Sequence, residues 1–175
     1  MNEAAATIPV GAGGLFMLPF GNGPERMLNN RYTGAQIRGL DVNLHTPAHL
    51  SRAAQESVAF AFRYGLDIMT ENGMKPGIIR AGRANMFRSA VFTQSFVDVT
   101  GVPVELYDTD GSVGAALGAG VGAGIFEDPS AAFRERRPVQ LVEPLAKVQH
   151  EALYQKWKQL LQAELGKTTP AGVFV

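Results

Sequence analysis

The sequence of 175 residues contains no cysteine. This absence excludes disulfide bonds, thiolate metal sites and cysteine nucleophiles, and it is compatible with a reducing cytoplasm. An excess of charge of either sign is also lacking, because 16 lysines and arginines balance 16 aspartates and glutamates. Without a net positive charge, the chain has no global field that would attract nucleic acid or an anionic membrane. We therefore expect neither as a partner.

Long apolar runs are missing as well. No stretch approaches the roughly 20 consecutive apolar residues that a membrane helix needs. The N-terminus lacks the basic start and apolar centre of a secretory signal. Apolar residues still make up 46% of the sequence, which is enough to bury the core of one compact domain. The sequence thus predicts a soluble, cytoplasmic protein.

A long helix over residues 47–72 is the clearest element that the sequence does contain. Thr46 is a good N-cap, Pro47 suits the first helical position, and Gly73 suits the C-terminal end. Apolar residues recur within it at three- and four-residue spacing, which predicts one buried face. The expected buried residues are Leu50, Ala53, Ala54, Val58, Ala61, Phe62, Leu66 and Met69.

Shorter elements surround this helix. Turn residues and apolar runs predict strands over 14–20, 35–44, 77–81, 102–108 and 139–144. Helices are predicted over 89–101, 112–126 and 146–165, with a short one starting at Asp128. Residues 112–126 are almost wholly Ala and Gly, which lowers helix propensity and indicates close packing against a neighbouring backbone. Residues 166–175 are expected to be a mobile tail.

The alternation of strand and helix between residues 77 and 125 predicts an α/β layer, with a ligand crevice at the carboxyl ends of its strands. The segment AGRANMF, residues 81–87, follows one such end. Its small residues would let a ligand approach the backbone, and Asn85 can donate and accept hydrogen bonds, as a purine edge or a ribose requires. An ordinary strand-to-helix loop explains the same residues equally well.

Several sharper motifs fail. The glycines of GAALGAGVGAG do not satisfy G-x-G-x-x-G, which disfavours a dinucleotide-binding oxidoreductase. Asp108 starts a segment like a calcium loop, but Ala119 stands where a bidentate Glu is needed. His45 and His49 are separated by the expected helix start and have no evident third ligand, so we expect no metal site. Neither a P-loop nor a G-x-S-x-G motif occurs.

Three arginines surround the AGRANMF segment, namely Arg80, Arg83 and Arg88. Guanidinium groups bind phosphate well, although solvated arginines at the edge of a domain are the commoner case. The sequence leaves both interpretations open.

Together, these segments resemble the C-terminal lobe of the FGGY family of carbohydrate kinases, and within that family the xylulokinase branch most of all. The resemblance rests on four segments that occur in the family's order. They are GLFMLPFGNGPER, GAQIRGLDVNLHTPAHLSRAAQESVAFAFR, IIRAGRANMF and TQSFVDVTGVPVELYDTDGSVGAALGAG. The third stands at the place of the family's glycine-rich adenosine motif, but it has Ala81-Gly82-Arg83-Ala84-Asn85 where consecutive glycines and Ala-x-Ser are common.

The resemblance implies an α/β fold of the actin-like, ribonuclease-H-like ATPase type, in which two lobes close over a sugar and ATP with Mg²⁺. Residues 1–165 would form the nucleotide-side lobe, incomplete at its N-terminus. Ala81 and Gly82 would approach the nucleotide through their backbone. Ala84 and Asn85 would lie beside adenine or ribose, and Arg83 would stack on adenine or face the phosphates.

The resemblance also implies that essential parts lie elsewhere. The general-base Asp, the first phosphate loop and most sugar-binding groups belong to the other lobe of such a kinase. Positioning dominates phosphoryl transfer, so we expect no catalytic residue in these 175 residues and no sugar phosphorylation by this chain alone. Its parent would phosphorylate a ketose such as D-xylulose.

An alternative interpretation is a self-standing, non-catalytic module that keeps the fold for association or weak nucleotide binding. An apolar surface left open by the missing lobe, which a homo-oligomer would cover, would instead favour the kinase interpretation. The sequence does not assign Glu25 and Arg26, which suit either an interlobe contact or an ion-paired loop. Asp110 would either be a functional residue at a strand end or cap the following helix.

Overall fold

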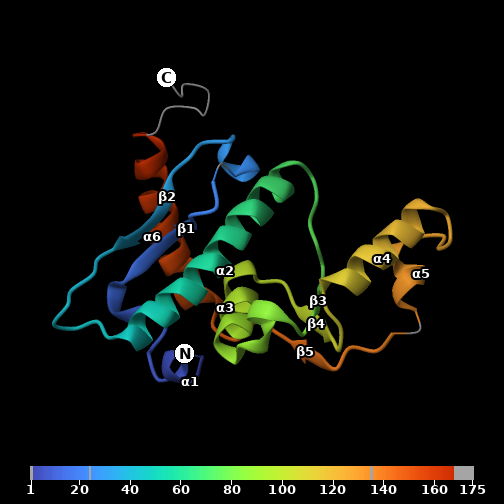
Figure 1. The fold of residues 1–175 in the computed structure, drawn as a ribbon, viewed down its shortest axis with the longest axis horizontal. Coiled ribbons are helices and arrows are strands. Elements are labelled where there is room, and N and C mark those ends of the chain that lie inside the picture. The colour runs from blue at the N-terminus through green and yellow to red at the C-terminus, as the bar shows by residue number, and fades with distance from the viewer. Residues whose placement is uncertain (1, 24, 135, 168–175) are drawn as a thin grey trace.

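The computed structural model describes residues 2–23, 25–134 and 136–167, and helix α2 (Pro47–Glu71) runs through the middle of them (Figure 1). Its start follows the prediction closely. Pro47 occupies the first turn, and the backbone N–H of Thr46 donates to Nδ1 of His49 at 3.2 Å. This bond satisfies a backbone donor just ahead of the helix, where such groups lack helical partners.

The core lies where α2 meets helices α3 (Ala90–Thr100) and α6 (Lys147–Leu165) and strand β1 (Phe16–Phe20). Trp157 of α6 is fully buried at its centre. Its ring centroid lies 6.1 Å from that of Phe20 and 6.0 Å from that of Phe60. Its indole Nε1 donates to the carbonyl of Met17 at 2.7 Å, so the polar end of this large side chain is satisfied as burial requires.

The buried face of α2 matches the expected one only in part. Ala53 and Ala61 are buried as expected. Phe62 and Met69, expected inside, are 52% and 39% exposed. Their part of α2, together with β1, lines an apolar groove of about 560 Å³. The expectation failed at these positions because α2 is buried around most of its circumference over residues 51–61, whereas no residue of the helix beyond 61 is fully buried.

That buried face includes an ion pair. Arg52 Nε lies 2.6 Å from Glu56 Oε1, and both side chains are almost fully buried. The backbone N–H of Gly11 donates to both carboxylate oxygens of Glu56 at 3.1 Å. The pair therefore anchors the N-terminal segment, where α1 (Asn2–Ala6) and a short 3₁₀ helix, η1 (Ala12–Gly14), lie. Sequence patterns predicted neither of these two elements.

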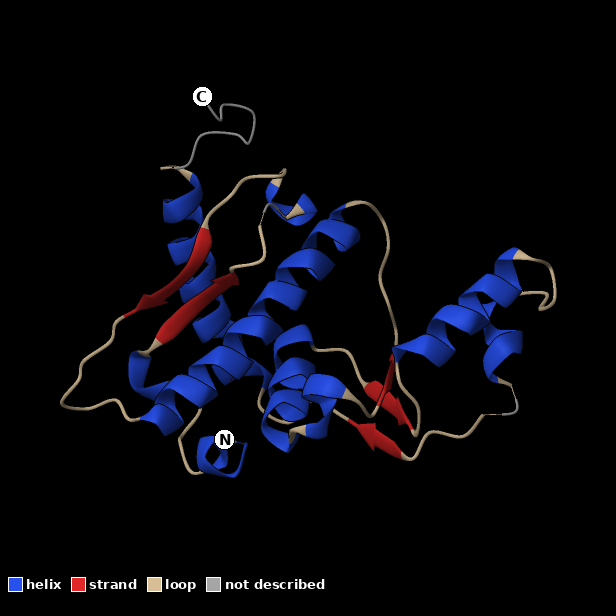
Figure 2. Cartoon of the chain, in the orientation of Figure 1, coloured by secondary structure: helices blue, strands red, loops and turns tan. Residues whose placement is uncertain are grey.

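The strands form two separate sheets (Figure 2). Strand β1 pairs antiparallel with β2 (Gly34–Arg38). In the second sheet, β3 (Ile79–Gly82) pairs parallel with β4 (Val104–Tyr107), and β5 (Gln140–Val142) joins β4 antiparallel at the edge. The parallel pair confirms the expected strand-helix-strand layer, and β5 confirms the strand that the sequence predicted within 139–144.

Helices α4 (Gly111–Gly122) and α5 (Pro129–Phe133) project from this second sheet as an arm (Figure 1). The close backbone packing expected for the Ala/Gly helix is wrong for the described residues. A Cβ placed at Gly114 or Gly118 would meet nothing within 4 Å, while one at Gly120 would meet the ring of Phe126. The helix is mostly exposed because only one of its glycines faces another part of the described chain.

Two further findings complete the fold. Helix α6 ends at Leu165, and most of the expected tail, from residue 168 onward, lies outside the described residues. Among the residues that are described, no helix is both long enough and apolar enough to span a bilayer.

Candidate functional site

The loop that follows β3 is tied closely to the loop that follows β4. A Cβ at Gly82 would lie 2.4 Å from the carbonyl oxygen of Thr109 and 3.1 Å from the Cα of Asp110. Because those atoms belong to backbone, any side chain at this position would force the two loops apart. Arg83 continues the strand pairing, since its N–H donates to the carbonyl of Tyr107 at 2.8 Å. Glycine here brings two strand ends together.

The chain then turns sharply into a 3₁₀ helix, η3 (Asn85–Arg88), and into α3. Asn85 has φ of 49°, in the left-handed region that asparagine adopts more readily than most residues. Ser89 caps α3 by accepting from the N–H of Phe92, a role that serine favours at a helix start, and its hydroxyl donates to Gln55 of α2 at 2.6 Å. The loop is therefore held at its start by backbone contacts with the loop after β4 and at its end by the buried hydrogen bond between Ser89 and Gln55.

Four of the five residues expected to bind a nucleotide line one cavity of about 280 Å³, which we call the Asn85 cavity. It is lined by Phe62, Ala81, Gly82, Ala84, Asn85, Met86, Phe87, Phe92 and Gly111. Small residues form one part of its lining and aromatic rings another, with the Asn85 amide as a polar group. A flat, partly apolar ring with hydrogen-bonding edges suits such a lining.

A second cavity of about 230 Å³ shares Ala81, Gly82 and Gly111 with the first. Its other lining residues include Arg80 and Tyr107. Glu105 accepts from the Tyr107 hydroxyl at 2.8 Å and from Arg80 Nε at 2.9 Å. These hydrogen bonds lower the pKa of Glu105, while burial and the same carboxylate raise the pKa of Tyr107.

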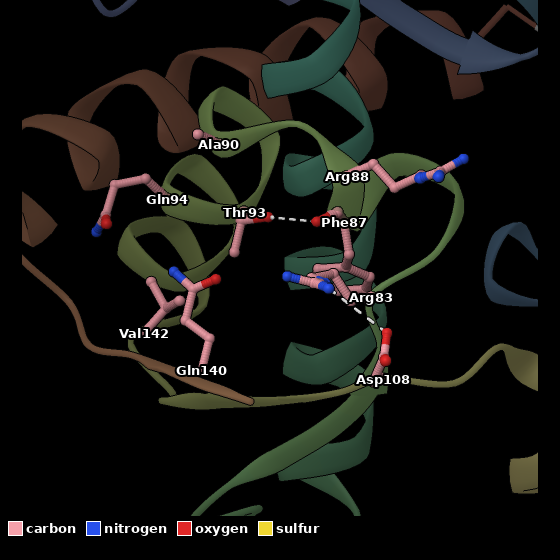
Figure 3. Close-up of a pocket in the computed structure, with 9 residues that line it drawn as sticks. All are labelled: Arg83, Phe87, Arg88, Ala90, Thr93, Gln94, Asp108, Gln140 and Val142. Atoms are coloured by element: carbon pink, nitrogen blue, oxygen red, sulfur yellow. Dashed lines mark hydrogen bonds and ion pairs between the residues drawn. The ribbon is translucent and has the colours of Figure 1, made fainter. Parts of the chain in front are cut away.

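The fifth expected residue, Arg83, points elsewhere (Figure 3). It lines a larger and more polar cavity of about 510 Å³, which we call the Arg83 cavity. The lining residues are Arg83, Phe87, Arg88, Ala90, Thr93, Gln94, Asp108, Gln140 and Val142. Since the Asn85 cavity shares only Phe87 with this set, the structure separates Arg83 from the four residues with which sequence reasoning grouped it.

The other candidate residues have simpler roles. Asp110 caps α4, accepting from the N–H and hydroxyl of Ser112, and these hydrogen bonds lower its pKa. Glu25 lines the apolar groove beside α2 rather than the Asn85 cavity, and Arg26 is exposed in the short 3₁₀ helix η2 (Arg26–Leu28).

The two histidines near the start of α2 lie close together, with ring centroids 5.4 Å apart. The Nδ1 atom of His45 accepts from the N–H of Asp41, and that of His49 accepts from Thr46. Within the described part of the chain, no three His, Asp or Glu side chains gather as metal ligands would.

Sequence reasoning missed the aromatic part of the Asn85 cavity. Phe62 comes from α2, far along the chain from the loop, and the helical pattern assigned it to the core. Gly111 comes from the start of α4. Phe87 had a local signal, because it ends the AGRANMF segment itself.

Comparison with known proteins gives a consistent result. Residues 1–123 match the C-terminal domain of the FGGY family of carbohydrate kinases. The chain is 32% identical over 173 residues to L-xylulose/3-keto-L-gulonate kinase of Escherichia coli, covering 95% of this chain and 33% of that protein. It is 38% identical over 125 residues to xylulose kinase of Haemophilus influenzae, covering 70% of this chain and 24% of that protein.

A solved structure shows the same likeness in three dimensions. The crystal structure of xylulose kinase from Rhodospirillum rubrum superposes with a TM-score of 0.73 at 29% identity, covering 93% of this chain and 33% of that one. The expected α/β fold of the actin-like, ribonuclease-H-like type is thereby confirmed. The chain spans a third or less of the length of these relatives.

Proposed function

Because this chain belongs to the FGGY family of carbohydrate kinases, we propose that it is the nucleotide-side lobe of an ATP-dependent sugar kinase. Members of the family are phosphotransferases. In this proposal the Asn85 cavity receives the adenosine part of ATP. Ala81 and Gly82 approach the nucleotide through their backbone, and Ala84 and Asn85 lie beside the base or the ribose.

The observation that carries this proposal is the convergence of Ala81, Gly82, Ala84 and Asn85 on one cavity at the carboxyl end of β3. Ligands of open α/β sheets bind at such strand ends. Gly82 supports the proposal further, because its lack of a side chain is what keeps the two strand-end loops in contact. The aromatic lining contributed by Phe87 and Phe92 suits a purine.

The sugar that the whole kinase phosphorylates is a proposal from similarity alone. Two of the matched relatives are named as kinases of xylulose or L-xylulose. We therefore propose a ketose such as D-xylulose as the phosphoryl acceptor, with D-xylulose 5-phosphate as the product.

Phosphoryl transfer also needs Mg²⁺ and a general base. In the described residues no acidic cluster suits Mg²⁺, and neither Asn85 nor its small neighbours can serve as a base. We propose that ATP carries its Mg²⁺ and that the remaining groups come from the sugar-binding lobe. The lobe described here would then bind nucleotide without phosphorylating sugar by itself.

Titration calorimetry with ATP and with ADP, each with Mg²⁺, tests the adenosine pocket. We expect both nucleotides to bind with similar affinity, since the proposed contacts involve adenosine rather than the terminal phosphate. An Asn85→Ala variant should bind about tenfold more weakly, because one charge-free hydrogen-bonding group in a cavity contributes about 1–1.5 kcal/mol.

Arg88→Gln is the matched control, because Arg88 lies in the same loop but does not line the Asn85 cavity. It should leave ADP affinity within about twofold, since an exposed charge away from the ligand contributes little. Equal weakening by both variants, or no nucleotide binding by a chain that circular dichroism shows to be folded, would contradict the proposal. The second outcome would favour the alternative of a module that keeps the fold for association.

A further inference from the structure

The Arg83 cavity lies beside the proposed nucleotide pocket but is distinct from it. Its walls come from η3, the first turns of α3, the end of β4 and strand β5. In Figure 3 the guanidinium of Arg83 points into the space that Thr93, Gln140 and Val142 border, while the guanidinium of Arg88 extends away from it. One cation therefore faces the interior of this cavity.

Arg83 is held only loosely in its present position. Its Nη2 lies 3.5 Å from Oδ1 of Asp108, and the two side chains are 51% and 78% exposed. An ion pair this long and this exposed contributes little, because water screens it and both side chains lose rotamer freedom in making it. Among the residues that the structure describes, Arg83 has no other side-chain partner. A ligand would therefore displace little when it binds this guanidinium.

Gln140 faces the same space from the opposite wall (Figure 3). Its backbone is fixed by pairing with Leu106 across the sheet. Its side-chain amide makes no hydrogen bond with any residue in 2–23, 25–134 or 136–167. The Arg83 guanidinium and the free Gln140 amide are thus two hydrogen-bond donors on opposite sides of the cavity. Both side chains project from backbone that is paired with β4.

Another part of the lining is well packed. Val142 and Thr93 are buried, and Thr93 directs its hydroxyl away from the space by donating to the carbonyls of Ser89 and Phe87. The ring of Phe87 packs edge-on against Phe92 at 5.2 Å. This packed part of the lining keeps its shape without a ligand, which lowers the entropy cost of binding.

From this arrangement we propose that the Arg83 cavity is a second ligand site that binds a small oxyanion, a carboxylate or a phosphate group. Arg83 donates two parallel hydrogen bonds to the anion, in the fork geometry that guanidinium offers to planar oxyanions. The Gln140 amide donates a third from the opposite side, and Asp108 releases Arg83 when the anion arrives. The remainder of an organic anion would lie over Val142 and Phe87.

Nuclear magnetic resonance titration of the ¹⁵N-labelled chain tests this site without nucleotide, so its outcome is independent of the proposed kinase function. The probes are inorganic phosphate and acetate, with chloride at matched ionic strength as the control. We expect phosphate, acetate or both to produce a saturable shift of the Arg83 Nε–H and Gln140 side-chain amide signals, and chloride to produce none. The two probes distinguish a phosphate ligand from a carboxylate ligand.

Two arginine variants sharpen the test, because each removes one positive charge from the lining of the same cavity. Arg83→Gln should weaken binding at least about tenfold, with the Gln140 amide as the reporter. Arg88→Gln should change the affinity less than about twofold. Asn85→Ala, in the other cavity, should leave anion binding unchanged.

Three results would overturn the proposal. They are the absence of saturation with both probes, an equal response to chloride, and an equal weakening by Arg83→Gln and Arg88→Gln. The last result would mean that the anions sense only the general positive charge of the loop. Because Arg83 is half exposed and its ion pair with Asp108 is long, its variant should fold, and circular dichroism checks this.

Discussion

The core around Trp157 and the arm of α4 and α5 are both rich in apolar residues, yet most residues of the arm are exposed. Trp157 and Phe60 are almost inaccessible, whereas Ile125 in the arm is 75% exposed. In the core, helices α3 and α6 and strand β1 converge on α2. In the arm, α4 contacts mainly α5 and the end of β3. The difference teaches that apolar sequence predicts a capacity for burial, and that a neighbouring element decides whether burial occurs.

Replacing Trp157 by Ala should strongly destabilise the core. The side chain is fully buried, contacts several aromatic rings and satisfies a backbone carbonyl. We expect the free energy of unfolding to fall by about 3–5 kcal/mol, as is typical for large-to-small substitutions of a buried aromatic residue. Urea denaturation followed by circular dichroism measures it.

Ile125→Ala is the matched change in the arm. Because Ile125 is mostly exposed, the free energy of unfolding of the variant should stay within about 0.5 kcal/mol of that of the original chain. A comparable loss from both substitutions would mean that the arm is packed in solution, against a second copy or against another part of the chain. That result would remove the contrast between the two regions.

A smaller effect comes from the polar rim of the core, where two side chains donate hydrogen bonds to Asp67. The Tyr154 hydroxyl donates to its Oδ2 and Arg63 Nε donates to its Oδ1 at 2.7 Å. Burial alone would raise the pKa of Asp67, but the hydrogen bonds from Tyr154 and Arg63 outweigh it and lower the pKa. Tyr154→Phe should therefore lower the free energy of unfolding by about 1 kcal/mol at pH 7.

The pH dependence gives this prediction its sign. A carboxyl whose pKa is lower in the folded state adds stability above its unfolded pKa, about 3.9, and loses it as the pH falls through the folded value. The difference in the free energy of unfolding between the original chain and Tyr154→Phe should thus have its full size at pH 7 and become smaller below pH 4. Urea denaturation at several pH values checks this. Tyr64→Phe, in the same aromatic cluster but without such a hydrogen bond, should show no such trend, and a constant difference for Tyr154→Phe down to pH 2.5 would contradict the assignment.

The sequence predicted much of this fold, because its strongest signals are local. The long helix follows from Thr46, Pro47 and the apolar repeat, and the caps Ser89 and Asp110 lie where their residue types indicate. The choice of buried face on α2 failed in part, since Phe62 and Ala59 are both apolar and only tertiary contacts distinguish them. No periodicity marks the buried pair of Arg52 and Glu56.

The candidate site shows the same limit. Residues next to one another in AGRANMF could be grouped from sequence, and four of the five proposed ligand residues do share a cavity. The direction of the Arg83 side chain could not be foreseen, because consecutive residues of an extended segment point to opposite sides and the turn at Asn85 follows at once. The contribution of Gln140 depends on β5 pairing with β4, which is a long-range contact.

The smallest effect that we predict concerns the arm alone. A methyl group at Gly118 would meet nothing within 4 Å, and the residue lies inside α4. Gly118→Ala should stabilise α4 by about 0.5–1 kcal/mol, because alanine loses less backbone entropy in a helix. Hydrogen exchange of the α4 amides should slow by about two- to fivefold, and Ala119→Gly should accelerate it by a similar factor. Exchange in α6 should not change, because an arm with so few contacts to the core can open without it. If Gly118→Ala slowed exchange equally in α4 and α6, the arm and the core would unfold as one unit. The two regions would then have the same stability against local unfolding although they differ in burial.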